Sequence, residues 1–166
     1  MVSREGNHPP GGEVAPTMSK IYLASSWRNQ EYPKVLKKLR AKGHQVYDFR
    51  STGPLESGFA WDEVAKDWLH WTPREFIKHL NHPASLRGFT SDKTALDWAD
   101  TCVLLLPCGR SAHLEAGYAS GQGKRVIFLL RKLAFEPELM YLLGTEMVCS
   151  VPELIQTLKK KRKKQS

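Results

Sequence analysis

Short apolar runs alternate along the chain with segments whose apolar residues recur at helical spacing. The clearest run is Thr-Cys-Val-Leu-Leu-Leu at residues 101–106. A continuous apolar run of this length is typical of a central parallel strand buried on both faces. The same pattern predicts further strands at residues 20–24, 45–49, 125–130 and 146–149.

Helices are predicted between these strands. Gly43 is a natural stop for the first helix, and Ser91 is a suitable N-cap for a later one. Residues 61–80 have irregular helical spacing, whereas residues 50–60 are rich in Gly, Pro and Ser and predict a loop that faces a substrate. The predicted helices cover residues 32–42, 91–99, 137–142 and the segments that begin at 112 and 152. Strands that alternate with helices predict a single α/β domain with a doubly wound parallel sheet, flavodoxin-like or Rossmann-like.

Composition adds a boundary at each end. With 166 residues and 41% hydrophobic content, the chain can bury the core of one domain, which we expect at residues 19–158. Residues 1–18 contain few apolar positions and predict a disordered leader rather than a signal peptide. The formal net charge is +8, and residues 159–164 supply six of these charges, so residues 159–166 form a basic tail.

The basic tail leaves three interpretations open. It is a nuclear-import signal if the source is eukaryotic, a salt-sensitive contact to nucleic acid, or a solvated helix end. The three cysteines form no CxxC pair, which favours a reducing, cytoplasmic location. No stretch is long enough to span a membrane, and the histidines have no metal-ligand spacing, so neither a membrane nor a metal or other cofactor is expected.

The most informative segment is residues 107–123, which follows the apolar strand at 101–106. Ligands bind beyond such strand ends in open α/β sheets. Glu115 is predicted near the start of the helix in this segment, where unpaired N–H groups favour negative charge and keep a carboxylate ionised. We therefore consider Glu115 a candidate nucleophile. The alternative is an exposed acid that only stabilises its helix.

Three segments together resemble the nucleoside 2-deoxyribosyltransferase family over roughly residues 19–150. They are Ile-Tyr-Leu-Ala-Ser-Ser-Trp-Arg at residues 21–28, Asp92 eight residues before Asp100, and Glu-Ala-Gly-Tyr-Ala at residues 115–119. The resemblance implies a flavodoxin-like fold, cleavage of the N-glycosidic bond of a nucleoside or nucleotide, and a homo-oligomer. It also implies that Glu115 is the nucleophile, that Asp92 helps to protonate the departing base, and that Tyr22 orients Glu115.

The resemblance extends to a phosphate site. Ser26 and Arg28 resemble the serine and arginine that hold the 5′-phosphate in the 2′-deoxynucleoside 5′-monophosphate hydrolase branch, whereas Trp27 is similar to the transferase branch. Gly109, Arg110 and Ser111 in the second turn are further candidates for substrate binding. A guanidinium with hydroxyl groups suits a phosphate because it supplies charge-assisted, directional hydrogen bonds. The choice between hydrolysis and transfer stays open.

The chemistry makes its own demand for two acids. Breaking a C1′–N bond requires one carboxylate at C1′ and a second group that gives a proton to the base, as in retaining glycosidases. A helix N-terminus lowers the pKa of Asp92 and opposes its use as an acid, unless burial or the charge of Glu115 raises that pKa. Asp92 as an extension of the N-cap is the structural alternative, and core packing is the alternative for Tyr22.

Other readings remain for the rest of the chain. Trp61, Trp68 and Trp71 fall at helical spacing, so we expect them to pack in the core or at a subunit interface rather than to stack on a base. Ser111 and His113 are two residues apart and do not form a hydrolase dyad. The alternative function for the whole chain is a nucleotide-binding sensor or interaction module without chemistry.

Overall fold

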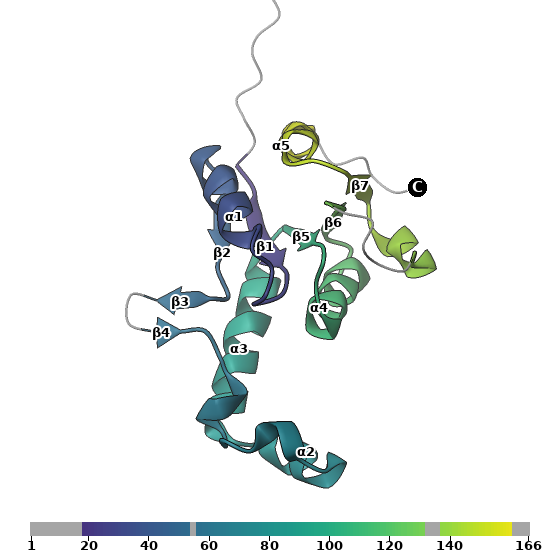
Figure 1. The fold of residues 1–166 in the computed structure, drawn as a ribbon. Helices are drawn as coiled ribbons and strands as arrows, with labels where there is room; N and C mark the ends of the chain where they lie inside the picture. Colours follow the sequence, from purple (N-terminus) through teal and green to yellow (C-terminus); the bar gives the residue numbers. More distant parts are fainter. Residues whose placement is uncertain (1–17, 54–55, 132–136, 161–166) are drawn as a thin grey trace, which may run out of the picture.

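A five-stranded parallel sheet forms the centre of the protein (Figure 1). The computed structural model describes residues 18–53, 56–131 and 137–160. The sheet has the order β2-β1-β5-β6-β7, and every pairing in it is parallel. Its strands are β1 (Lys20–Ala24), β2 (Gln45–Tyr47), β5 (Thr101–Leu105), β6 (Arg125–Leu129) and β7 (Glu146–Val148). When only the five strands of this sheet are numbered along the chain, their order is 2-1-3-4-5, which is the order of flavodoxin-like sheets. The predicted fold class is therefore confirmed.

Helices cover both faces of the sheet. Along β1, Ile21 and Leu23 pack in the layer formed with α1 (Tyr32–Ala41) and α5 (Val151–Lys159). Tyr22 and Ala24 alternate with them and pack in the opposite layer, formed with α3 (Pro83–Trp98) and α4 (Arg110–Gly121). Because side chains alternate between the faces of a strand, burial on both faces explains the unbroken apolar run of β5.

Two helices begin earlier than the sequence predicts. We expected a helix with Ser91 as its N-cap, but α3 begins at Pro83, and His82 is the cap because its Nδ1 accepts from the N–H of Ala84. A proline is favourable in the first turn, where its missing N–H is not needed. The helix continues through Gly88, where the Cβ of any other residue would lie 2.7 Å from Phe59. Similarly, α4 begins at Arg110 with Gly109 as its cap, not at residue 112.

The segment between β2 and α3 also differs from the prediction. Residues 50–60 are not wholly a loop, because β3 (Ser51–Gly53) and β4 (Glu56–Ser57) pair antiparallel. Residues 61–80 form two single turns, η1 (Trp61–Glu63) and η2 (Trp68–His70), and then α2 (Pro73–His79). The rings of Trp61 and Trp71 pack edge to face with centroids 5.7 Å apart. Both are only half-buried and lie outside the two core clusters, so core packing was wrong for them, and packing at a subunit interface stays a prediction. A 3-10 turn, η3 (Leu139–Leu143), stands where a helix over 137–142 was expected.

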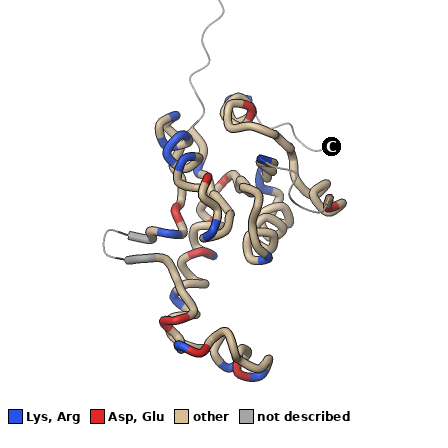
Figure 2. The backbone as a smooth tube through the Cα atoms, in the orientation of Figure 1, with Lys and Arg blue, Asp and Glu red and all other residues tan. Residues whose placement is uncertain are grey.

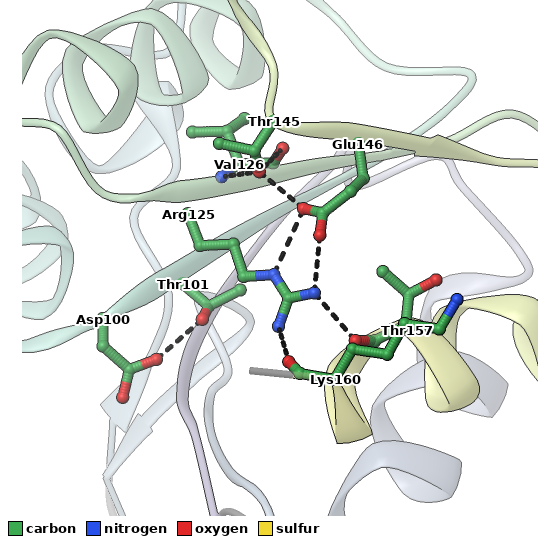
Figure 3. Close-up of polar contacts among 8 residues, drawn as sticks. All are labelled: Asp100, Thr101, Arg125, Val126, Thr145, Glu146, Thr157 and Lys160. Atoms are coloured by element: carbon green, nitrogen blue, oxygen red, sulfur yellow. Dashed lines mark hydrogen bonds and ion pairs between the residues drawn. The ribbon is translucent and has the colours of Figure 1, made fainter. Parts of the chain in front are cut away.

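Arg125 ties the last helix to the sheet (Figure 3). It is the first residue of β6 and only 6% exposed. Its guanidinium donates to both carboxylate oxygens of Glu146, at 3.1 and 2.6 Å, and to the carbonyl oxygens of Thr157 and Lys160 at the end of α5. These contacts lie at the amino-terminal edge of the sheet, away from the strand ends where the site is expected.

Basic residues are not confined to the tail, because α1 carries Lys34, Lys37, Lys38 and Arg40 and Figure 2 shows them along that helix. The predicted leader and the tail beyond Lys160 lie outside the described residues. Among the helices that the structure describes, none is long and apolar enough to cross a membrane.

Candidate active site

The carboxyl ends of β1 and β5 meet at the point where the chain changes direction across the sheet, the usual ligand position in this architecture. Two hydrogen bonds join the turns that follow these strands. The hydroxyl of Ser25 donates to the carbonyl oxygen of Leu105 at 2.9 Å, and the amide of Asn29 donates to that of Pro107 at 3.1 Å. The turn after β1 and the turn before α4 are therefore held as one unit.

Glu115 lies in the second turn of α4 and is partly buried. The sequence placed it in the first turn and expected it to be ionised, and that expectation is wrong because the field of a helix end fades within one turn. Burial and, to a smaller extent, the negative charge of Asp92 raise the pKa of Glu115 to about 8, against a lowering effect of Tyr22. Near neutral pH, Glu115 therefore carries a proton in most molecules.

Asp92 lies in the middle of α3 rather than beside an N-cap. The expected lowering of its pKa by a helix N-terminus is therefore absent. Burial raises the pKa of Asp92, and a hydrogen bond from the Tyr47 hydroxyl, 3.0 Å from Oδ1, opposes that rise. The two carboxyl groups come from neighbouring helices, and they lie close enough for the charge of Asp92 to raise the pKa of Glu115.

Tyr22 is 1% exposed and packs in the layer of α3 and α4. Burial raises the pKa of its hydroxyl, and the charges of Glu115 and Asp92 raise it further. The hydroxyl is close enough to Glu115 to lower the pKa of that carboxyl group. Its geometry does not meet the criteria for a hydrogen bond to any described residue. The structure therefore brings together the three residues that the sequence singled out as catalytic candidates.

Sequence reasoning missed Tyr47, which is the register partner of Tyr22 on β2. The two rings stack, with centroids 5.3 Å apart and planes 20° apart. The hydroxyl of Tyr47 also lies 2.9 Å from the hydroxyl of Ser91. The sequence offered one signal, because a tyrosine on a strand next to β1 can reach the same layer as Tyr22.

The loop after β1 carries Ser26, Trp27 and Arg28. Trp27 and Arg28 are exposed, and the hydroxyl of Ser26 accepts from the N–H of Arg28 at 3.2 Å. The sequence missed Arg50, whose Nη2 donates to the carbonyl oxygens of Ser26, Trp27 and Asn29 at 2.8, 2.9 and 2.9 Å. Its guanidinium lies 4.4 Å from the ring centroid of Tyr32, so this residue organises the loop.

The second group of substrate-binding candidates begins α4. Gly109 is the cap, and Arg110 and Ser111 are exposed in the first turn. Gly109 and Arg110 line a cavity of about 680 Å³ between α4, β6 and η3, together with His113, Gly117, Phe128 and Tyr141. His113 and Gly117 lie on the opposite side of α4 from Glu115, so this cavity is separate from the carboxyl pair. His113 is bonded to the carbonyl oxygen of Gly109 and the hydroxyl of Tyr141.

The described cysteines near the site are poor nucleophiles. Burial and the charge of Glu115 raise the pKa of Cys102 and raise that of Cys108 to about 12, so both remain thiols. Within residues 18–53, 56–131 and 137–160, no group of three or more His, Cys, Asp or Glu side chains is arranged to hold a metal ion. The candidate groups for acid–base chemistry at this site are the two carboxyl groups and the tyrosines beside them.

No protein-family model matches the chain, and no curated protein sequence does. Solved structures do. The 2-deoxyribosyltransferase of Bacillus psychrosaccharolyticus is 22% identical, with a TM-score of 0.56 over 85% of this chain and 96% of that one. A conserved protein of Enterococcus faecalis V583 is 16% identical, with a TM-score of 0.55 over 86% and 98% of the two chains.

A third structure, the CMP N-glycosidase of Clostridium botulinum, is 19% identical over 83% of this chain and 95% of that one, but its TM-score of 0.43 is too low to support an argument. The first two structures resemble this chain in the arrangement of the backbone, at a low sequence identity. They show that this chain has the fold of the Bacillus psychrosaccharolyticus 2-deoxyribosyltransferase.

Proposed function

We propose that the protein is an enzyme that cleaves the N-glycosidic bond of a nucleoside or nucleoside 5′-monophosphate, with Glu115 as the nucleophile and Asp92 as the proton donor. The observation that carries this proposal is the coupled carboxyl pair. The two acids come from different helices, and burial together with the negative charge of Asp92 raises the pKa of Glu115 to about 8. Fold likeness to a 2-deoxyribosyltransferase is independent support.

Glu115, whose pKa is about 8, carries the proton that the reaction needs before substrate binds. We infer that binding of substrate moves this proton to Asp92, which faces the base. Glu115 then attacks C1′ as a carboxylate, the C1′–N bond breaks, and the proton on Asp92 passes to the departing base. Tyr22 lies beside Glu115 and stabilises its ionised form, as its effect on that pKa indicates.

The second half of the cycle returns the pair to its starting state. Asp92, now a carboxylate, takes a proton from the acceptor, and the acceptor oxygen or nitrogen attacks C1′ of the sugar ester. The ester bond to Glu115 breaks, and the carboxyl pair again holds one proton. If the acceptor is water the enzyme is a hydrolase, and if it is another base the enzyme is a transferase.

The loop after β1 is our proposed 5′-phosphate site. Ser26 supplies a hydroxyl and Arg28 a guanidinium, and both belong to a loop whose carbonyl oxygens are drawn toward Arg50. Because those oxygens face Arg50, fewer negative dipoles face an incoming anion. Trp27 is 51% exposed and offers a ring face or edge to the substrate. Gly109, Arg110 and Ser111 at the start of α4 stay further candidates for substrate binding, although Gly109 and Arg110 also line the separate cavity.

The remaining parts of the proposal concern the oligomeric state, the metabolic role and the location of the protein. We propose a homo-oligomer in nucleoside salvage, with the exposed apolar side chains of Leu139, Met140 and Leu142 on η3 available for a second copy. A leader, a basic tail and a cytoplasmic location belong to the same proposal. A nucleotide sensor without chemistry is less well supported, because two acids near an anion weaken its binding.

A chromatographic assay tests the function. Purified protein is incubated with deoxyribonucleosides, ribonucleosides and their 5′-monophosphates, with and without a second free base. Release of free base by the wild type and not by Glu115→Gln supports the proposal. Base exchange identifies a transferase. Nucleotide binding without turnover anywhere in the panel contradicts the proposal and supports the sensor.

A further inference from the structure

Two stacked tyrosines lie beneath the carboxyl pair, one for each acid. Tyr22 and Tyr47 are register partners on β1 and β2, and their rings stack with centroids 5.3 Å apart. The hydroxyl of Tyr22 lies beside Glu115, whereas the hydroxyl of Tyr47 donates to Asp92 Oδ1 at 3.0 Å. Each acid therefore has a phenol beside it, and the two phenols are held in a fixed relation by the sheet.

The hydroxyl of Tyr47 is the centre of a directed chain. It has one proton, and that proton goes to Asp92. The contact of 2.9 Å between the hydroxyls of Tyr47 and Ser91 is then completed by donation from Ser91. The order is Ser91 to Tyr47 to Asp92, and it links β2 to two successive residues of α3.

This chain distinguishes the two oxygens of the Asp92 carboxyl group. Oδ1 is an acceptor already engaged by Tyr47, so a proton carried by Asp92 is on Oδ2. We propose that Tyr47 is a positioning residue that fixes the orientation of Asp92 so that Oδ2 presents the proton to the departing base. This inference rests on the proposed function and assigns Tyr47 and Ser91 a part in it.

The surroundings of Asp92 make Tyr47 the group best placed to fix it. From β1 it is faced by Tyr22, and from α4 by Glu115, which makes no hydrogen bond to it. On α3 itself, Lys93 is bound to Asp97 and does not reach Asp92. Among the described residues, Tyr47 is therefore the hydrogen-bond donor to the Asp92 carboxyl group.

The test compares two substrates that differ in their need for a proton. The departing base of 2′-deoxyguanosine, or of its 5′-monophosphate, must be protonated as it leaves, whereas that of the 7-methyl derivative already carries positive charge and needs no proton. We expect Tyr47→Phe to lower kcat for the first substrate by roughly 10- to 100-fold, within the range of general acid catalysis. For the 7-methyl substrate we expect less than about a threefold change.

Tyr32→Phe is the matched control. Its hydroxyl also donates to an aspartate, Asp48, at 3.0 Å, but this pair lies away from the carboxyl pair. We expect it to leave the ratio of the two substrates unchanged. An equal loss on both substrates in Tyr47→Phe shows a merely structural role and overturns the inference.

A second measurement does not depend on turnover. Carbon-13 NMR of the Asp92 carboxyl group should give a higher pKa in Tyr47→Phe than in the wild type, because the lost hydrogen bond stabilises the ionised form. An unchanged pKa overturns the inference. The proposed function fails separately, if Glu115→Gln turns over either substrate at the wild-type rate.

Discussion

The negative charge of Asp92 raises the pKa of Glu115, although the two residues lie on different helices. Burial is the larger cause, and together the two effects bring that pKa to about 8. Near neutral pH, Glu115 therefore carries a proton in most molecules. A reaction that must give one proton to a departing base and provide one carboxylate to a sugar needs such a proton with a second acid close by.

The pH dependence of stability should report the buried carboxyl group of Glu115. Its pKa is about 8 in the folded protein against 4.5 in a free side chain, so the folded state binds more protons between these values. Stability from this group is complete below pH 4.5 and is lost as the pH rises through 8. We expect the wild type to lose roughly 2 kcal/mol more than Glu115→Gln between pH 5 and pH 8, after allowance for partial exposure. Urea unfolding at both pH values measures this, and equal losses in the two proteins refute it.

Removing the charge of Asp92 should lower the pKa of Glu115. In Asp92→Asn the neighbouring negative charge is gone, so less free energy opposes ionisation of Glu115. Carbon-13 NMR of the Glu115 carboxyl group measures the change. Asp97→Asn is the control on the same helix, because Asp97 is engaged by Lys93 and Tyr118 and does not act on Glu115. The same pKa in Asp92→Asn and the wild type contradicts the coupling.

Arg50 should be needed for the order of the loop that carries Ser26 and Arg28. Arg50→Met keeps an apolar stem but leaves three carbonyl oxygens without their donor. We expect faster hydrogen exchange across residues 25–29 and a loss of about 2 kcal/mol in the free energy of unfolding. Arg50→Lys should recover only part of this, since an ammonium lacks the planar guanidinium.

Arg87→Met is the control for the arginine substitution, because Arg87 is exposed and forms only a 3.7 Å pair with Glu63. We expect a change within about 0.5 kcal/mol there. Unaltered exchange in the loop of Arg50→Met argues against its organising role. The KM of Arg50→Met is a further measurement. It should rise more for a 5′-monophosphate than for the corresponding nucleoside.

Arg125 should contribute to stability and not to turnover. Arg125→Met removes both bonds to Glu146 and both bonds to the end of α5, and it leaves the Glu146 carboxylate without its partner (Figure 3). We expect the free energy of unfolding, measured by chemical denaturation, to fall by about 3 kcal/mol, as it does when one partner of a buried ion pair is removed. Activity per folded molecule should not change, because the candidate site lies at the opposite edge of the sheet from Arg125. Lys66→Met, which breaks an exposed pair with Asp62, should have little effect on stability.

The parallel sheet was predictable because its signal is local. The apolar run of β5 and the strands before and after it are each contained in a few consecutive residues. The helix α1 ends at Ala41, two residues before Gly43, whose φ of 86° suits glycine. The helix boundaries near the candidate site were harder to predict. Pro83 marked the start of α3 and could have been used, but Ser91 gave the stronger local cap signal and shifted Asp92 to a helix end.

The parts of the site that were missed depend on contacts between distant segments. Tyr47 reaches Asp92 across 45 positions, and Arg50 reaches Ser26 across 24. Neither residue stands in a motif, and no periodicity distinguishes them from neighbouring residues. The partial burial that raises the pKa of Glu115 likewise follows from packing between α3, α4 and β1, which the order of residues alone does not display.

The most direct measurement is release of free base from deoxyribonucleosides and their 5′-monophosphates by the wild type, Glu115→Gln and Asp92→Asn. The account predicts turnover by the wild type, a loss of at least roughly a thousandfold in Glu115→Gln, and trapping of a sugar ester on Glu115 by mass spectrometry with a slow substrate. Turnover at the wild-type rate in Glu115→Gln, or a sugar attached to another residue, contradicts the central claim.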